Sequence, residues 1–501
     1  MSQYGNIFKA TFLFGFVQVF VILAKIGINK VVALFLGAEG LGIISLYNST
    51  CSLVSLGAGL GIHQSAVKDL AEARGIDDKD KISTTITVVK KIIKYTALLG
   101  IIVTAAISPI LSEYTFGNKD YTIGYLLMSL VVGATIMTNG YRAINTGMRQ
   151  LRFVALSTVY GSFAGLVSAI PFYFFLGRNG IEISLIVSAI STLIIARHYT
   201  LKIKYTPKII SVKGTISQSS SMVKMGIALM LLSFIFNLQQ LITASFISHI
   251  GGLAQVGLYQ AGALIIIGYF SLIANAMETE YYPRLASISN DTFKMNEAVN
   301  SQPIVWLVLA IPAVVLFILM VPVFIKILYS DQFIEVASYI DIAVIGTLIS
   351  FLSACINKVL IVKNDTRIFL YSSISINVVS LFISLSLYSV YGLRGLGFGY
   401  MIGNILQLLV YNLIMRHRYS IYFNQRVYKV LFIAIICTVA SIVLRNCPIA
   451  LVKWSGSICL FCLSFSFSLY YANKYLHLNI LNAIYTKIKK RKDVIKEDEN
   501  N

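Results

Sequence analysis

The sequence predicts an all-α integral membrane protein with about 14 transmembrane helices. Its 501 residues are 57% hydrophobic and 12% charged, with a mean hydropathy of +0.78, whereas a soluble domain carries about 25% charged residues. Runs of about 20 apolar residues, long enough to cross a bilayer as a helix, recur along the whole chain. The runs do not alternate apolar and polar residues as strands of a membrane barrel do, so the predicted spans are helical.

The predicted spans follow one another with short connections. They cover residues 10–36, 41–66, 88–111, 121–147, 153–176, 181–200, 222–248, 254–281, 303–328, 335–361, 368–391, 395–415, 428–445 and 453–472. We group the first six spans into an N-terminal lobe (1–210) and the next six into a C-terminal lobe (211–418). The last two spans and the basic tail (419–501) form an appended segment.

The distribution of Lys and Arg predicts the orientation of the spans. If the N-terminus is cytoplasmic, most of the 41 Lys and Arg residues lie on the cytoplasmic side, as the positive-inside rule requires. Six of them lie on the outer side, namely Lys119, Arg178, Lys326, Arg394, Arg445 and Lys453. We therefore expect both termini in the cytoplasm, and we ascribe the net charge of +20 to the anionic inner leaflet. Nucleic acid is not an expected partner.

The chain repeats internally at an offset of 215 residues. The matching positions are Gly37 and Gly252, Gly42 and Gly257, Leu70 and Leu285, Tyr114 and Tyr329, Arg152 and Arg367, Gly177 and Gly392, and Gly180 and Gly395. The repeat unit contains six spans, and an even number returns the chain to the same side of the membrane. The sequence therefore predicts two pseudo-symmetric six-helix lobes in the same orientation, as in transporters with parallel repeats, plus two extra C-terminal helices.

Two short motifs of the kind that hold cofactors are present in incomplete form. The stretch GAEGLG, with Gly37, Gly40 and Gly42, matches neither the dinucleotide-binding fingerprint nor the P-loop, so we predict a tight turn between two spans. Cys459 and Cys462 have CxxC spacing inside a hydrophobic run without a nearby histidine, which favours packing over zinc binding. We expect no cofactor and no metal.

Ionisable side chains inside spans indicate a cavity or a partner, because each costs about 2.5–3.5 kcal/mol at the centre of a spanning helix. In the N-terminal lobe these are Lys25, Lys30, His63 and Arg142. Lys30 lies about 9 Å from the outer end of its span, so it either reaches the surface or faces a cavity. For Lys25, midway along the span, a cavity is favoured. His63 either packs between helices or faces the same cavity.

The C-terminal half contributes amides, acids and one lysine. We predict that Asn237, Gln239, Gln240 and Lys358 face the cavity and that Glu278 and Asp341 are candidates for ion coupling. At the offset of 215, Glu278 corresponds to His63. Cations from one half and hydrogen-bonding groups from the other suit an anionic head group with a polar extension, such as a phosphate linked to sugars.

Two long stretches resemble a known family. KVVALFLGAEGLGIISL followed by LGAGLGIHQSAVKDLAEA is similar to the N-terminal helical pair of bacterial oligosaccharide-lipid flippases, and VGLYQAGALIIIGYFSLIANAMETEYYPRLASI is similar to the matching pair in their second half. These are the Wzx-type O-antigen translocases of the multidrug/oligosaccharidyl-lipid/polysaccharide exporter superfamily. The resemblance covers about residues 5–418, and the likeness is greatest to flippases of the enterobacterial common antigen type.

The resemblance implies a flippase in the bacterial inner membrane. It implies that two lobes alternate in access and move an undecaprenyl-diphosphate-linked oligosaccharide from the inner to the outer leaflet, coupled to an ion gradient. The family's basic position near the outer end of the first helix corresponds to Lys30. Expected partners are membrane lipids, a polysaccharide polymerase and a chain-length regulator, with the protein itself a monomer.

Three other classes of function remain open on the sequence. A multidrug or organic-cation antiporter of the same superfamily needs acids in the N-terminal lobe, and the spans of this lobe carry no acid at mid-membrane. A membrane polysaccharide-assembly enzyme, such as a polymerase, usually carries a sizeable outer loop, whereas the longest predicted outer loop is about 111–122 and contains only Glu113 and Asp120 as acids. A scramblase-like assembly protein is the third alternative.

Overall fold

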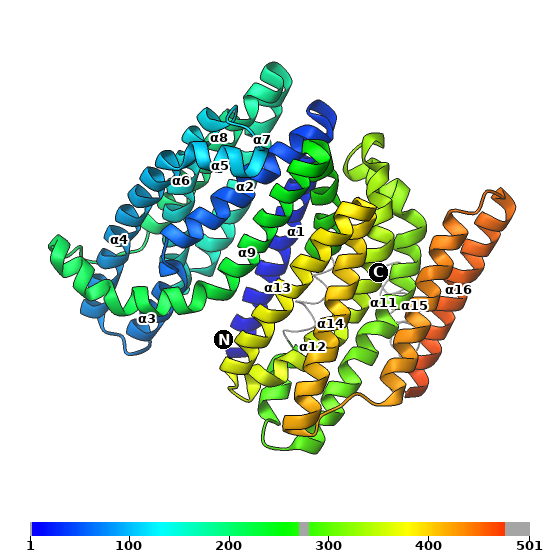
Figure 1. Ribbon diagram of the computed structural model, residues 1–501. Coiled ribbons are helices and arrows are strands. Elements are labelled where there is room, and N and C mark those ends of the chain that lie inside the picture. The colour runs from blue at the N-terminus through cyan, green and yellow to red at the C-terminus, as the bar shows by residue number, and fades with distance from the viewer. Residues whose placement is uncertain (1–2, 270–279, 476–501) are drawn as a thin grey trace, which may run out of the picture. The chain divides into compact units, whose positions relative to one another are not determined.

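The computed structural model describes residues 3–269 and 280–475, and every regular element in this part of the chain is helical (Figure 1). The chain divides into two compact units. The first holds the residues up to Ala261 and the segment Ile325–Glu335, and the second holds Gly262–Phe324 and the residues from Val336 onward. Each unit is described separately below.

The helices of the first unit follow the predicted spans with a few differences. They are α1 (Gln3–Phe35), α2 (Gly37–Ala58), α3 (Ile62–Gly75), α4 (Lys79–Ala106), α5 (Ser108–Phe116), α6 (Thr122–Gly147), α7 (Leu151–Leu176), the 3-10 turn η1 (Gly177–Gly180), α8 (Ile181–Leu201) and α9 (Val212–Ala263). The predicted outer loop 111–122 is partly helical, because α5 extends to Phe116. This helix bends away from α4 by 64°. The label α9 covers two helices that meet at a kink at Gly252 (φ 79°, ψ 174°), which agrees with the boundary predicted between spans 222–248 and 254–281.

A network of tyrosines holds together one end of the first unit. The Tyr47 hydroxyl donates to Glu182 at 2.9 Å, and the Tyr125 hydroxyl shares hydrogen bonds with Thr50 and Thr115, both at 2.9 Å. The rings of Tyr47 and Tyr125 meet edge to face with centroids 5.1 Å apart, and both side chains are fully buried. This network joins α2, α5, α6 and α8, with every buried hydroxyl paired as burial demands.

Three pairs of positions 215 residues apart share a positive φ. They are Gly37 and Gly252 (66° and 79°), Gly177 and Gly392 (54° and 59°), and Arg149 and Asn364 (52° and 58°). A positive φ is uncommon for residues other than glycine. The third pair is therefore the most informative, because neither member is a glycine and both follow the end of a long helix.

The hydrogen bonds around this third pair also match. The Gln150 amide donates to the Asn145 carbonyl at 2.8 Å, and 215 residues later the Asp365 amide donates to the Leu360 carbonyl at 2.9 Å. In both places the bond closes a helix end around a left-handed residue, which is the geometry of a Schellman cap. The same turn therefore ends α6 and its counterpart in the second unit.

Gly42 in α2 and Gly257 in α9 lie where two backbones cross at close range. A Cβ atom on Gly42 would collide with the carbonyl oxygen of Leu253. A Cβ atom on Gly257 would collide with the carbonyl oxygen of Ala38. The second contact repeats the first at the offset of 215, because Gly42 corresponds to Gly257 and Ala38 corresponds to Leu253. In the first contact α2 supplies the glycine and α9 the carbonyl oxygen, and in the second contact these roles are reversed. Because the obstacle is backbone in each case, only glycine allows this approach.

The second unit contains the remaining helices. They are the short π-helix η2 (Leu264–Tyr269), a helical segment over 280–287, α11 (Thr292–Leu328), α12 (Ala337–Val362), α13 (Thr366–Tyr391), α14 (Leu393–Tyr419), α15 (Gln425–Arg445) and α16 (Ala450–Tyr475). The 3-10 turn η3 (Asp331–Val336) precedes α12. Among these helices α12 is the most deeply buried, and α16 is the outermost, packed on α15 (Figure 1).

A buried ion pair ties α15 to the rest of the second unit. Arg445 lies 2.5 Å from Asp341 on α12, and the two side chains are only 7% and 14% exposed. The same guanidinium donates to the Ile318 carbonyl of α11 at 3.3 Å. The sequence predicted Arg445 as the last residue of span 428–445, and α15 ends at this residue. Its partner, an acid 104 residues away, was not predicted.

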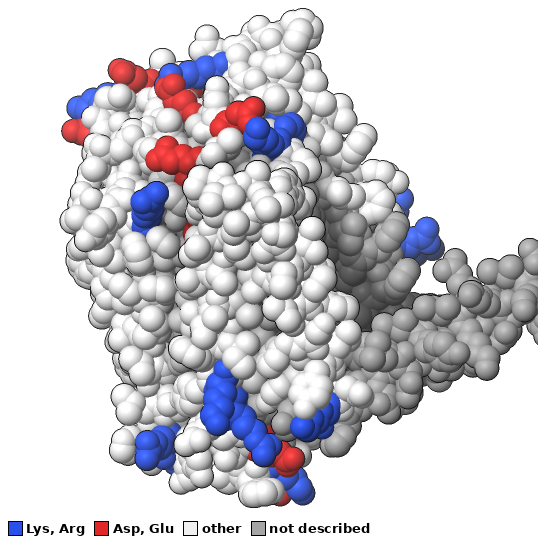
Figure 2. All heavy atoms as spheres, turned by 90° about the vertical axis from the view of Figure 1, so that its right-hand side faces the viewer, with Lys and Arg blue, Asp and Glu red and all other residues white. Residues whose placement is uncertain are grey.

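The protein is a multi-pass membrane protein. Ten helical stretches among the described residues are long and apolar enough to span a bilayer, or eleven if the bent pair α4 and α5 counts as one span. The stretch of 51 residues contains the predicted spans 153–176 and 181–200, and the stretch of 55 residues contains 222–248 and the first part of 254–281. Residues 270–279 of the latter span lie outside the described residues. Figure 2 shows a face on which charged side chains gather at two ends and leave a wide band almost without them, as expected for a surface in lipid.

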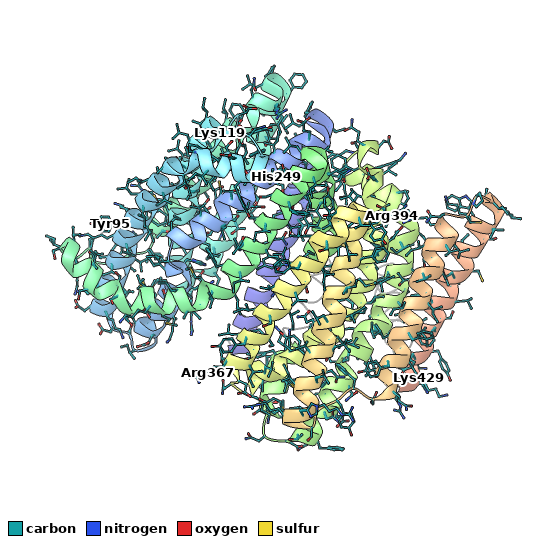
Figure 3. All side chains as sticks on the ribbon, in the orientation of Figure 1. Tyr95, Lys119, His249, Arg367, Arg394 and Lys429 are labelled. Atoms are coloured by element: carbon teal, nitrogen blue, oxygen red, sulfur yellow. The ribbon has the colours of Figure 1, made fainter. Side chains whose placement is uncertain are left out.

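Basic residues of the second unit also lie at the ends of its helices. Arg367 and Lys429, which begin α13 and α15, lie toward one end of this unit, and Arg394 lies toward the other (Figure 3). This arrangement is compatible with the predicted orientation, in which Arg394 is one of the few cations on the outer side.

Candidate functional site

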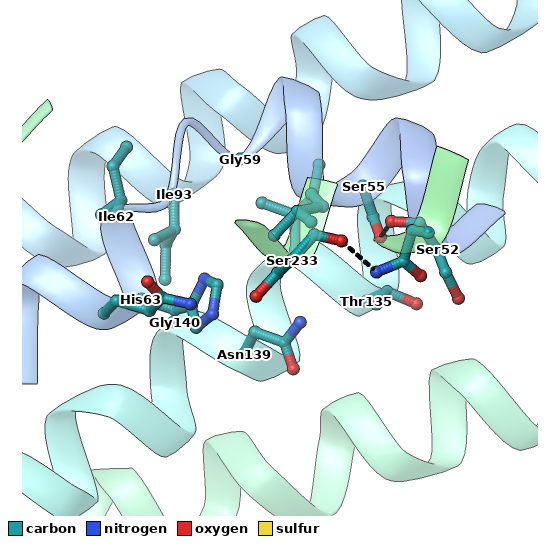
Figure 4. Close-up of a pocket in the computed structure, with 14 residues that line it drawn as sticks. Ser52, Ser55, Gly59, Ile62, His63, Ile93, Thr135, Asn139, Gly140 and Ser233 are labelled. Carbon is teal, nitrogen blue, oxygen red and sulfur yellow. Dashed lines mark hydrogen bonds between the residues drawn. The ribbon is translucent and has the colours of Figure 1, made fainter. Parts of the chain in front are cut away.

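A polar pocket of about 230 Å³ lies within the first unit (Figure 4). Its walls come from α2, the turn that follows it, α3, α4, α6 and α9. The lining residues are Ser52, Ser55, Leu56, Gly59, Ile62, His63, Gln64, Ile93, Thr135, Ile136, Asn139, Gly140, Ser233 and Asn237. Two of the predicted cavity residues, His63 and Asn237, are therefore brought together although they are far apart in the sequence.

Helical spacing explains how α2 and α6 present polar groups to the pocket. Residues three or four apart share one face of a helix, and Ser52 and Ser55 of α2 have this spacing, as do Thr135 and Asn139 of α6. Most of the other buried residues of the two helices are apolar or glycine. The two helices thus combine an apolar packing face with a narrow polar stripe.

The turn between α2 and α3 places His63 in the pocket. Gly61 has a φ of 61°, and a Cβ atom there would collide with the backbone of Gly226 in α9. The chain can therefore turn sharply and still pack closely on α9, and α3 starts at Ile62 with His63 facing the pocket. Figure 4 shows the His63 ring and the Asn139 carboxamide on the same side of the pocket.

Several hydrogen-bonding groups of the pocket remain available to a ligand. The side-chain amide of Asn237 donates to the backbone carbonyl of Ser233 at 2.8 Å. The Ser55 hydroxyl donates to the backbone carbonyl of Ser52 at 3.1 Å. The side chains of His63 and Asn139 have no hydrogen-bond partner among residues 3–269 and 280–475. These two side chains and the side-chain oxygen of Asn237 offer hydrogen-bond donors and acceptors to a ligand in the pocket.

Among the residues that the structure describes, no Asp, Glu, Lys or Arg lines the pocket. The nearest predicted cation along the chain is Arg142, which continues the stripe of Thr135 and Asn139 by one turn of α6 toward the end predicted to be cytoplasmic. Its Nε is buried and lacks a hydrogen-bond partner within the part of the chain that the structure describes. The site thus combines a neutral polar pocket with one cation beside it.

The two lysines of α1 have different surroundings. Lys25 is exposed and makes no ion pair or hydrogen bond with any described residue. Lys30 donates to the Lys326 carbonyl at 2.7 Å and to the Tyr329 carbonyl at 2.5 Å, so it caps the end of α11 by binding its terminal carbonyls. Neither lysine lines the pocket.

The remaining predicted residues are spread over both units. Gln239 and Gln240 follow Asn237 on α9, and the Gln239 Oε1 is buried without a partner among described residues. Lys358 lies on α12 in the second unit. Asp341 pairs with Arg445, and its Oδ1 has no hydrogen-bond partner in the described part. Glu278 lies outside the described residues.

The sequence missed six polar residues of the pocket. They are Ser52, Ser55, Gln64, Thr135, Asn139 and Ser233. Uncharged polar residues lower the hydropathy of a span only slightly, so they do not stand out as lysines do. Spacing identifies five of them, because on α2, α6 and α9 polar residues recur three or four positions apart in otherwise apolar helices. Gln64 lies on the polar helix α3 and carries no such signal.

The chain matches one known family over most of its length. The profile of a family described as "Polysaccharide biosynthesis protein" matches residues 31–338. The Lipid III flippase of Escherichia coli (strain K12) is 27% identical over 163 residues, and that of Shigella flexneri matches equally. The match takes up 32% of this chain, which spans 38% of the length of these curated relatives.

Solved structures with the same architecture extend over nearly the whole chain. The lipid II flippase MurJ in an inward closed conformation has a TM-score of 0.67 at 12% identity, covering 93% of this chain and 99% of that one. An inward-facing multidrug resistance MATE family transporter of the MOP superfamily has a TM-score of 0.62 at 19% identity, covering 82% and 96%. At these identities the likeness shows a shared fold.

Proposed function

Because the chain belongs to the polysaccharide biosynthesis protein family, we propose that it is a flippase for a lipid-linked oligosaccharide. The substrate is an undecaprenyl-diphosphate-linked repeat unit, moved from the inner to the outer leaflet of the bacterial plasma membrane. The flippases among its relatives and the MurJ-like fold support this class of activity. The substrate and the membrane are part of the proposal.

The observation that carries the proposal is the neutral polar pocket. Sugars present hydroxyl and amide groups without charge, and a site for them needs several hydrogen-bonding groups at fixed positions. The side chains of His63, Asn139 and Asn237 meet this requirement in one pocket of the first unit. An organic cation would instead require a carboxylate, and none of the described residues that line the pocket carries one.

The diphosphate requires cations, and we assign these to Arg142 and Lys25. Arg142 continues the polar stripe of α6 beyond the pocket, and its guanidinium can bind phosphate oxygens in a bidentate manner. Lys25 is an exposed lysine near the middle of α1. In this scheme Lys30, Gln239, Gln240 and Lys358 line the path of the substrate at other stages of transport.

The transport cycle is alternating access by two pseudo-symmetric six-helix lobes, residues 1–210 and 211–418. The three matched pairs of positive φ and the matched helix ends support a repeat of this length. Transporters built from parallel repeats place their substrate at the interface of the halves. Glu278 and Asp341 are the candidates for coupling this cycle to an ion gradient.

Reconstitution of the full-length protein tests this function. Proteoliposomes carrying a fluorescent undecaprenyl-diphosphate oligosaccharide in the inner leaflet are exposed to an external lectin, and the fraction of glycan that becomes accessible is followed over time. We expect exposure with the wild-type protein and much slower exposure with Arg142→Gln. Efflux of an organic cation such as ethidium, without exposure of the glycan, would instead establish the multidrug antiporter.

A further inference from the structure

A second, apolar groove lies between α7 and α8, with a volume of about 490 Å³. It is lined by Tyr160, Phe163, Ala164, Val167, Ile194, Ile195, His198 and Tyr199. The two helices approach closely beside it, because a Cβ atom on Gly161 would lie 3.0 Å from Thr192 and one on Gly165 would lie 2.7 Å from Ser188. From Val167 to Tyr160 the groove extends for about 10 Å along α7.

One end of the groove carries aromatic and basic side chains. The Lys202 ammonium lies 4.9 Å from the centre of the Tyr199 ring. The ring of Phe153, the residue after Arg152, lies 5.7 Å from the Tyr199 ring between centroids, so the start of α7 reaches this end of the groove. His198 contacts Tyr199 edge to face. Arg152 begins α7 and Lys202 follows the end of α8, so the two antiparallel helices bring both cations to the mouth of the groove, at the predicted cytoplasmic end.

No acid of these helices neutralises this end. Between Tyr121 and Met277 the sequence contains a single acidic residue, Glu182, which begins α8 at the opposite end and accepts a hydrogen bond from Tyr47. Neither Arg152 nor Lys202 forms an ion pair with any residue that the structure describes. The mouth of the groove is therefore cationic and open to an anionic group.

We propose that this groove is a binding site for an anionic phospholipid of the cytoplasmic leaflet. The acyl chain lies along Phe163, Val167 and Ile194, and the phosphate binds Arg152 and Lys202. An apolar groove by itself selects little in a bilayer, because lipid tails are as apolar as its walls. Selectivity comes from the cations, since basic pockets between helices on this side bind anionic head groups.

The occupant is a bilayer phospholipid rather than the transported lipid. The groove lies within the first unit, and none of its residues lines the polar pocket. It contains no hydrogen-bonding group for a glycan apart from the aromatic hydroxyls and His198. The site is therefore independent of the proposed transport activity.

Native mass spectrometry of the purified full-length protein tests this site, with phosphatidylglycerol and phosphatidylcholine as the probes. We expect the wild-type protein to retain phosphatidylglycerol preferentially. The substitutions Arg152→Gln and Lys202→Gln should each weaken this preference about fivefold. The matched control, Arg426→Gln with Lys429→Gln, removes exposed cations of α15 that line no part of the groove and should leave the preference unchanged.

A second pair of variants tests the groove without altering charge. Val167→Phe fills the groove, whereas Val379→Phe adds the same bulk to an exposed position of α13, where Val379 is 45% exposed and Val167 52%. Only the first should release the bound lipid. Equal retention of both phospholipids by the wild-type protein would overturn the proposal. So would displacement of phosphatidylglycerol by undecaprenyl phosphate at equal concentration, because the groove would then belong to the substrate.

Discussion

Arg445 closes the end of α15 onto Asp341 of α12 with a 2.5 Å ion pair in which both side chains are largely buried. Ionisable groups within a membrane protein are costly unless paired. Each partner supplies the counter-charge of the other, and the Asp341 Oδ2 binds the guanidinium while its Oδ1 has no hydrogen-bond partner in the described part. It also shows that the first of the two appended helices is bound into the second unit by more than apolar packing.

We predict that Arg445→Gln destabilises the protein by about 3–5 kcal/mol, because the substitution leaves the buried Asp341 carboxylate without its counter-charge. The double variant Asp341→Asn with Arg445→Gln should recover most of this loss, since it removes both charges. Thermal unfolding of the purified protein in detergent measures both effects. A double variant as unstable as the single one would show that the charge is not the cause.

The same double variant tests the role of Asp341 in transport. If Asp341 serves only the ion pair, the double variant should transport at nearly the wild-type rate, measured by exposure of glycan in proteoliposomes. Loss of transport by a stable double variant would assign ion coupling to Asp341.

We predict that Asn139→Ala raises the KM for a lipid-linked oligosaccharide by about three- to tenfold, because one hydrogen bond contributes about 0.5–1.5 kcal/mol. Asn139 lacks a partner in the described part of the chain, so the substitution leaves no buried group unpaired. The control is Asn179→Ala, which changes an exposed asparagine of η1. Equal KM values for the two variants would remove the pocket from the substrate path.

Gly42→Ala and Gly257→Ala should each disrupt the backbone crossing of α2 and α9, since the methyl group meets a carbonyl oxygen that cannot rotate away. We expect lower thermal stability, by about 1–3 kcal/mol as in overpacked cores, or loss of transport. Gly75→Ala is the control, because a Cβ atom at Gly75 has no neighbour within 4 Å. Wild-type stability and transport in all three variants would contradict the importance of this crossing.

The two lysines of α1 should respond differently to substitution. Lys25→Ala is expected to abolish glycan transport while the amount of folded protein stays normal, because Lys25 makes no contact that a described residue needs. Lys30→Ala is expected to lower stability as well, since the terminal carbonyls Lys326 and Tyr329 lose their donor. Immunoblots of membranes, unfolding curves and transport assays separate the two outcomes.

The sequence predicted the positions at which helices end better than it predicted which side chains meet. Glycine turns at Gly37 and Gly177 follow from local conformational preference, and both lie at predicted boundaries. Gly252 was also expected as a boundary, and two helices meet there at a kink with φ 79° and ψ 174°. Local preference therefore predicts each of these three changes of direction.

Long-range pairs lay beyond sequence reasoning for a physical reason. Lys30 binds carbonyl groups, which every residue possesses, so no residue type marks its partners 296 and 299 positions away. Arg445 and Asp341 were each noticed, but nothing local connects an arginine at one helix end with an acid 104 residues away. His63 and Asn237 were both placed in the cavity because a polar side chain in an apolar span is itself informative.

The reciprocal contact of Gly42 and Gly257 has a consequence for the origin of the chain. A half-length ancestor of six helices, paired with an identical copy about a twofold axis along the membrane normal, would form this contact twice with one glycine. With the proposed two-lobe repeat, fusion of two such genes would turn one required glycine into two. Each copy must then keep its own, because the backbone that it meets belongs to the other half.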